Sequence, residues 1–142
     1  MSWLSEKITE LKDALQENLA RGGAPSAGNI ALGNRGEKAA RRFLKRQGYD
    51  VVTRNFRASG AEIDIIALDG PTLVFIEVKT RSSFTAGRPE EAVDEDKQLH
   101  IRRAAEVFAA RYRATNRPQR FDVVAISGDP DEGNIELLKD AF

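Results

Sequence analysis

Apolar positions change their spacing along the chain, and each spacing predicts a different element. Over residues 2–20 they recur at alternating intervals of four and three, which is the period of an amphipathic helix with a narrow apolar stripe. Such a helix either docks on the domain of its own chain or pairs with a second copy, so a homodimer through residues 2–20 is one of two options. The stripe consists of Leu4, Ile8, Leu11 and Leu15.

The helical pattern stops at the glycines that follow. Residues 22–28 are all Gly, Ala, Pro or Ser, a composition typical of a flexible linker. We therefore predict an N-terminal amphipathic helix at 1–21, a linker at 22–32 and one compact domain at 33–142.

Within that domain, helical and strand patterns alternate. Some stretches carry apolar residues at intervals of three and four, and others are short runs rich in β-branched and aromatic residues. Three closely spaced strands predict an antiparallel meander, and a strand, a crossover helix and a further strand predict parallel pairing. The fold class is therefore α/β, a mixed sheet with helices on its faces. In chain order we predict a helix at 34–47, strands at 49–57, 62–68 and 73–80, a helix at 89–114, and strands at 121–127 and 135–138.

The second and third predicted strands form a hairpin whose register follows from its turn. If residues 69–72 make a four-residue loop, Leu68 lies opposite Leu73. Counting outward then places Asp64 opposite Glu77, and Glu62 opposite Lys79. Because side chains alternate along a strand, we expect these four polar residues to share one face. The apolar residues expected on the other face are Ile63, Ile65, Ile76 and Val78.

Two carboxylates placed opposite each other repel unless a proton or a cation lies between them, since their Cβ atoms are about 5 Å apart. The chain has no cysteine and one histidine, His100, so the usual zinc donors are missing. Carboxylate oxygens are hard ligands that suit magnesium, manganese or calcium. We expect Mg²⁺ as the cofactor, with Mn²⁺ as an alternative, bound by Asp64 and Glu77.

Magnesium in proteins usually binds one or two carboxylates and completes its shell with waters and substrate phosphate oxygens. This favours a phosphate ester as substrate, with the ammonium of Lys79 placed to position the attacking water. The other interpretation is a polar hairpin end in which Glu62 pairs with Lys79 and nothing is catalysed. Surface ion pairs contribute only about 0 to 1 kcal/mol, which gives little reason to place charges beside buried strands.

Charge changes the picture only locally. The 22 basic and 22 acidic residues give a formal net charge of zero, so the field of the whole chain does not attract nucleic acid. Acidic residues gather in 90–96 and arginines in 102–120. The predicted helix at 34–47 has a basic outer side that either contacts phosphates or forms a solvated face. These basic residues are Arg35, Lys38, Arg41, Arg42, Lys45 and Arg46.

Two further side chains could reach the carboxylates from the helices. Glu37 is the sole acid of the predicted helix at 34–47, and it is an additional ligand, a group that supports the ligands, or the partner of Arg41. Lys97 lies in an early turn of the predicted helix at 89–114, where it either approaches the site or faces solvent.

The 142 residues, 41% of them hydrophobic, suit a single core with a modest extension. No stretch approaches the roughly 20 apolar residues that span a bilayer, and the N-terminus lacks a basic start followed by an apolar run. We therefore expect a cytoplasmic protein that does not bind membranes. The absence of cysteine fits a reducing compartment and excludes thiol chemistry.

Several sequence blocks between Gly33 and Ser127 resemble the bacterial YraN family of predicted endonucleases in both order and spacing. The resemblance implies the restriction-endonuclease-like PD-(D/E)xK fold. It also implies that Asp64, Glu77 and Lys79 occupy catalytic metal-binding positions. Ala61 departs from the family pattern, which has glycine there. The blocks are Gly36-Glu37, Arg54-Asn55, Glu62 to Ala67, Phe75 to Arg81, Lys97 and Arg120 to Val124.

By the same resemblance, Glu37 matches the acid of the first helix and Glu62 the acid that opens the second strand. The catalytic residues that we expect are Asp64, Glu77, Lys79 and Glu37, and the metal ligands are Asp64, Glu77 and Glu62. The expected activity is magnesium-dependent hydrolysis of phosphodiester bonds in nucleic acid, with DNA ahead of RNA. The alternatives are a nucleic-acid-binding module and a protein-interaction module, each with little turnover.

Overall fold

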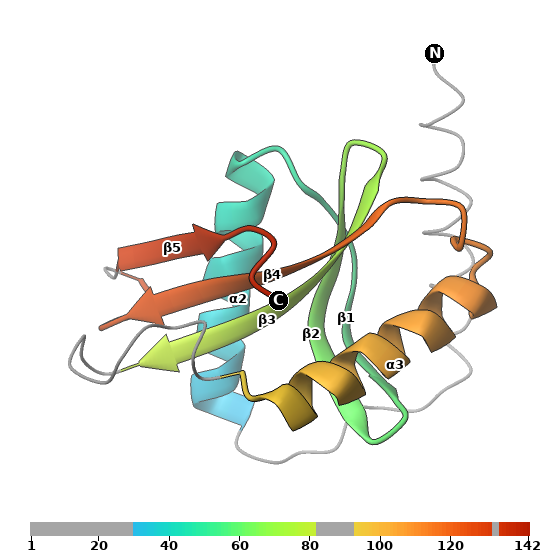
Figure 1. The fold of residues 1–142 in the computed structure, drawn as a ribbon. Coiled ribbons are helices and arrows are strands. Elements are labelled where there is room, and N and C mark those ends of the chain that lie inside the picture. Colours follow the sequence, from blue (N-terminus) through green and yellow to red (C-terminus); the bar gives the residue numbers. More distant parts are fainter. Residues whose placement is uncertain (1–29, 82–92, 132–133) are drawn as a thin grey trace.

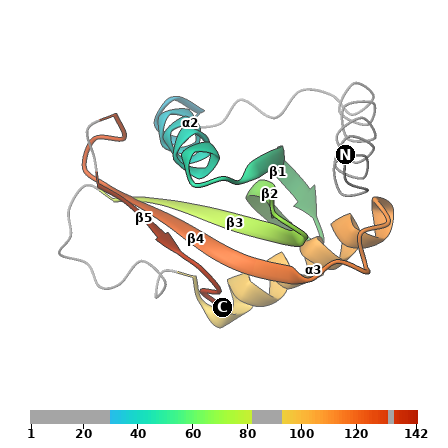
Figure 2. The same cartoon turned by 90° about the horizontal axis from the view of Figure 1, so that it is seen from above.

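The computed structural model describes residues 30–81, 93–131 and 134–142. The predicted N-terminal helix and most of the predicted linker lie outside these residues. Among them, five strands form one sheet, and α2 and α3 pack on its opposite faces (Figures 1 and 2). The elements are α2 (Ile30–Arg46), β1 (Asp50–Ala58), β2 (Ala61–Asp69), β3 (Thr72–Arg81), α3 (Glu95–Arg111), β4 (Gln119–Ser127) and β5 (Asn134–Leu138).

The strands follow the chain in the order β1-β2-β3-β4-β5. β1, β2 and β3 pair antiparallel, β3 and β4 pair parallel across the α3 connection, and β5 pairs antiparallel with β4. The predicted mixed sheet with an antiparallel meander is confirmed, and the arrangement is consistent with the restriction-endonuclease-like fold. None of the described helices is long and apolar enough to cross a membrane.

Both helices begin and end at residues other than the predicted ones, and the two starts differ most. α2 begins at Ile30, so residues 30–32 are helical rather than part of the linker. α3 begins at Glu95, rather than at residue 89, because Asp94 has an extended backbone and caps the helix. Its side chain accepts a 2.8 Å hydrogen bond from the Lys97 backbone N–H, one of the donors that a helix start leaves free.

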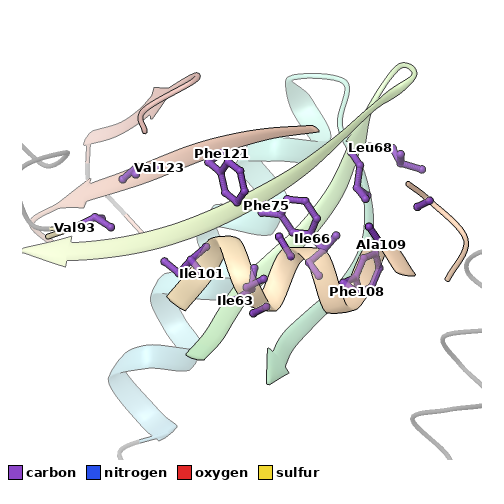
Figure 3. Close-up of a cluster of buried hydrophobic side chains, with 14 residues drawn as sticks. Ile63, Ile66, Leu68, Phe75, Val93, Ile101, Phe108, Ala109, Phe121 and Val123 are labelled. Carbon is purple, nitrogen blue, oxygen red and sulfur yellow. The ribbon is translucent and has the colours of Figure 1, made fainter. Parts of the chain in front are cut away.

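Two hydrophobic clusters cover the faces of the sheet. The cluster under α3 includes Phe75 and Phe108, whose rings meet edge to face with centroids 6.0 Å apart (Figure 3). The cluster under α2 includes Leu44, Val74 and Ile76. Because neighbouring residues of β3 enter different clusters, this strand is buried on both sides, as its continuous apolar run predicts.

The register of the β2–β3 hairpin is the predicted one, but its turn is tighter. Leu68 pairs with Leu73, and Asp69 also pairs with Thr72, so Gly70 and Pro71 alone form the turn. Gly70 has a φ of 58°, a left-handed conformation that glycine adopts without strain. The ladder runs outward as far as the pair of Ile65 with Ile76 and ends there.

In β2, the regular alternation of side chains between the two faces of the sheet breaks just beyond the end of this ladder. Ile65 lies in the α2 cluster, whereas Ile63 lies in the α3 cluster with Ile66. A regular strand would place Ile63 and Ile65 on one face, so the expectation for Ile63 is wrong. On β1, the residue that faces this break is Asn55, which has a left-handed φ of 54°. The irregularity therefore affects both strands at Asp64.

A buried ionic network ties β4 to its neighbours on the α2 side of the sheet. Asp122, which is fully buried, accepts hydrogen bonds from Tyr49 Oη (3.0 Å), Arg120 Nε (2.9 Å) and the Asp140 backbone N–H (2.9 Å). Arg120 also donates to Asp69 at 3.0 Å, beside the hairpin turn. Every oxygen of Asp122 is thus hydrogen-bonded, and the charge is neutralised in place.

Removing this carboxylate should destabilise the fold strongly. Asp122→Ala leaves Arg120 and Tyr49 without their buried acceptor, and breaking such a pair typically costs about 3 kcal/mol or more. Urea unfolding monitored by circular dichroism measures the change. Asp129→Ala, which removes an exposed partner of Arg35, is the control and should cost about 1 kcal/mol or less. Equal losses in the two variants would contradict the structural role given to Asp122.

The contact of α2 with β3 depends on Gly36. A Cβ atom at this position would lie 2.7 Å from Thr80 Oγ1, closer than two such atoms can approach. The next residue, Glu37, lies within reach of Asn55 on β1 and of the charge of Glu62 on β2.

Gly36→Ala should therefore destabilise the protein by about 1 kcal/mol, although alanine is the better helix former. Thr80→Ala removes the clashing oxygen and should restore most of that loss in the double variant. A double-mutant cycle of thermal unfolding tests the coupling. Additive effects of the two substitutions would show that the contact does not limit the approach of α2.

Candidate functional site

The two predicted carboxylates meet where the β2–β3 ladder ends. Glu77 is 6% exposed and follows Phe75 on the α3 side of β3. Asp64 reaches across to the same strand, where its Oδ2 accepts a 2.8 Å hydrogen bond from the Val78 backbone N–H. A backbone donor that would otherwise continue the ladder thus holds Asp64 beside Glu77.

This placement has a clear electrostatic consequence. Burial, followed by repulsion from Glu77, raises the pKa of Asp64 to about 8. The hydrogen bond from Val78 acts in the opposite direction and does not outweigh them. At neutral pH the pair therefore favours a shared proton or a bound cation over two bare charges.

Two lysines approach the same oxygen of Glu77. Lys97 Nζ, from the first turn of α3, lies 2.6 Å from Oε1, and Lys79 Nζ lies 3.6 Å from it. Burial and the adjacent ammonium of Lys97 lower the pKa of Lys79. Burial is the largest single influence on the pKa of Lys97 and lowers it, but the hydrogen bond to Glu77, the contact with Lys79 and the charges of Glu77 and Asp64 together raise it by more. Lys97, whose position the sequence left open, is thus part of the site.

The donor set fits a hard divalent cation. Glu77 Oε2 is buried and has no hydrogen-bond partner among the described residues, an arrangement that is costly unless something else binds the oxygen. The described residues contain no cluster of three or more His, Cys, Asp or Glu side chains that could bind a metal together, so a third protein carboxylate is not at hand. Asp64 and Glu77 would therefore supply two ligands, and waters or phosphate oxygens the remainder, as magnesium prefers.

Glu37 and Glu62 form a separate acidic pair with Asn55. With its amide nitrogen turned toward the carboxylates, Asn55 Nδ2 lies 3.3 Å from both oxygens of Glu37 and 3.1 Å from Glu62 Oε1. Burial and the charge of Glu62 raise the pKa of Glu37, and the charge of Arg41 opposes them. Glu37 also adds to the field that raises the pKa of Asp64, so the pair borders the site.

The expected contact of Glu62 with Lys79 is wrong. Glu62 lies opposite Arg57 of β1, whose Nε donates to Glu62 Oε2 at 3.3 Å. The change of alternation at Asp64 is the reason, because it directs Glu62 and Asp64 to different partners. The structure thus brings Asp64, Glu77 and Lys79 together but does not add Glu62 to them.

Sequence reasoning assigned Asn55 no role at the site. Its role depends on a left-handed backbone that no hydrophobic pattern encodes. Two signs were present: Arg54-Asn55 is one of the blocks that resemble the family, and asparagine adopts this conformation more readily than most other residues do.

The repulsion between Asp64 and Glu77 should make the free energy of unfolding depend on pH. Because the folded-state pKa of Asp64 is raised, the folded chain binds more protons than the unfolded chain between about pH 4 and pH 8. The free energy of unfolding should therefore fall as pH rises through this window. Asp64→Asn keeps the acceptor for Val78 and removes the repulsion, so it should flatten the slope and stabilise the protein by about 1 to 2 kcal/mol at pH 8. Thermal unfolding across this pH range measures the slope, and Asp129→Asn is the control. If Asp64→Asn had the same slope as the wild type, the raised pKa would not belong to Asp64.

Comparison with known proteins shows to which family the chain belongs. The profile of the uncharacterised protein family UPF0102 matches residues 36–126. A UPF0102 protein of Caldicellulosiruptor saccharolyticus is 48% identical over 113 residues, which is 78% of this chain and 96% of the relative. One from Syntrophus aciditrophicus is 44% identical over 114 residues, 80% of this chain and 90% of the relative. The chain belongs to the UPF0102 family, which is the YraN family, as the sequence blocks indicated.

Proposed function

We propose that this protein is a metal-dependent nuclease that hydrolyses phosphodiester bonds in nucleic acid. The observation that carries the proposal is the buried pair of Asp64 and Glu77, with one carboxylate oxygen unpartnered among the described residues and two ammonium groups beside it. Asp64 and Glu77 would hold Mg²⁺ or Mn²⁺. When bound, such an ion polarises a phosphoryl oxygen and acidifies a water.

The chain's own residues supply the rest of the chemistry. Lys79 Nζ lies 3.6 Å from Glu77 Oε1, where its ammonium can position the attacking water. The water oxygen forms a bond to phosphorus and its proton passes to solvent, while the bond from phosphorus to the leaving oxygen breaks and that oxygen takes up a proton from solvent. Lys97 pairs with Glu77 while no cation is bound, and its ammonium is a second positive group beside the site.

A nucleic-acid substrate is supported by local positive charge. Arg41 of α2 and Arg54 of β1 interact through space near Glu37, and burial together with the charge of Arg54 lowers the pKa of Arg41. Two like charges held together gain from a phosphate between them. By contrast, Arg35 donates to Asp129 and Asp131, so part of the basic face of α2 is already neutralised.

DNA is the first substrate to test, and RNA the second. The homodimer through residues 2–20 stays a prediction, because these residues lie outside those that the structure describes.

The test combines metal binding with cleavage. Asp64→Asn and Glu77→Gln should each remove Mg²⁺ or Mn²⁺ binding in calorimetry. They should also lower cleavage of single-stranded, double-stranded and branched DNA at least about a hundredfold, the scale for losing a charged group that acts on the transition state. Glu136→Gln, an exposed position on β5, is the matched control and should behave like the wild type.

Circular dichroism would verify that each variant keeps its fold. Full cleavage by Glu77→Gln would refute the proposed catalytic site. Nucleic-acid binding by the wild type, without any metal-stimulated cleavage, would favour the binding-module alternative.

A further inference from the structure

The backbone of Lys97 is held in place, whereas its side chain is partly exposed and contacts the Glu77 carboxylate at its tip. Its backbone N–H is bound by the cap residue Asp94, and Gln98 beside it donates to the Val93 carbonyl at 2.9 Å. The next turn is anchored in the core through Ile101, which is 2% exposed. The start of α3 is therefore fixed, and only the four-carbon stem of Lys97 decides where its ammonium lies.

Lys97 binds the same carboxylate that a metal would use, at Oε1, next to the unpartnered Oε2. A cation shared by Asp64 and Glu77 must lie close to the Glu77 carboxylate, and Lys97 Nζ already lies 2.6 Å from Oε1. With both carboxylates ionised, the charges of Lys79 and Lys97 balance those of Asp64 and Glu77. A divalent ion would then add two positive charges, and withdrawal of one ammonium would remove one positive charge from the site.

Of the two lysines, Lys97 is the one that can withdraw. Lys79 is on the same strand as Glu77, two residues away, and its side chain is 24% exposed. The side chain of Lys97 comes from a different element and is 37% exposed, so its ammonium can turn into solvent without moving the backbone.

We propose that Lys97 is an exchangeable counter-ion of Glu77, which competes with the divalent cation and leaves Oε1 when that cation binds. This inference rests on the proposed function, because it assumes that Asp64 and Glu77 bind a metal. The side chain of Lys97, rather than the backbone of α3, would then respond to the metal. Glu77 thereby keeps a positive partner whether or not a metal is present, and the lysine sets the threshold for metal binding.

Removing the positive charge should strengthen metal binding. Lys97→Met keeps the apolar stem and lacks the ammonium, so calorimetry on the full chain should show Mn²⁺ and Mg²⁺ bound about tenfold more tightly than by the wild type. Lys97→Arg keeps the charge and should stay within about threefold of the wild type. Lys139→Met removes one exposed lysine charge at the end of β5 and should leave the affinity unchanged.

Thermal unfolding gives a second readout. Without metal, Lys97→Met should melt at a lower temperature than the wild type, because Glu77 has lost a partner. Saturating Mn²⁺ should raise its melting temperature by more than it raises that of the wild type. Lys97→Gln is the second variant, in case the methionine variant does not fold.

The outcomes separate this inference from the proposed function. If binding depends on Asp64 but is equal or weaker in Lys97→Met and Lys97→Gln, Lys97 does not compete and the inference is overturned, while the metal site stands. If neither the wild type nor the Lys97 variants bind metal, both proposals fail. Tighter binding that Asp64→Asn abolishes in the Lys97→Met background supports both.

Discussion

Repulsion between two carboxylates, held together where a strand ladder ends, is the constraint around which this site is organised. Asp64 is fixed by the Val78 backbone N–H and Glu77 by its place in β3, so neither can move away from the other. The pKa of Asp64 rises to about 8 as a result. The surrounding cations, Lys79 and Lys97, are then needed to make the pair tolerable within a folded chain.

A second buried carboxylate in the same sheet shows what a purely structural acid looks like. Asp122 is fully buried, and both of its oxygens accept hydrogen bonds from Tyr49, Arg120 or the Asp140 backbone. Glu77 is almost as buried, yet among the described residues its Oε2 has no partner. Only a proton shared with Asp64 or a bound cation would satisfy that oxygen, and the contrast with Asp122 supports a functional role for Glu77.

The irregularity in β1 and β2 separates two acidic groups that are close in sequence. The left-handed Asn55 and the change of alternation at Asp64 direct Glu62 toward Glu37 and Arg57, on the other side from Lys79. Local backbone distortion of this kind is common at functional sites, where it aims side chains that a regular strand could not. Here it leaves Asp64 beside Glu77 and places Glu62 beside Arg57.

Hydrophobic spacing and turn residues determined much of this protein by themselves. They predicted the order of the elements, the parallel pairing of β3 with β4 and the hairpin register from which Asp64 and Glu77 were paired, because these depend on local periodicity. Only the tertiary structure decided the partner of Glu62, the face of Ile63 and the approach of Lys97 to Glu77. These depend on a backbone irregularity and on how α3 packs over the sheet, which involve residues far apart in the chain and leave no periodic trace in the sequence.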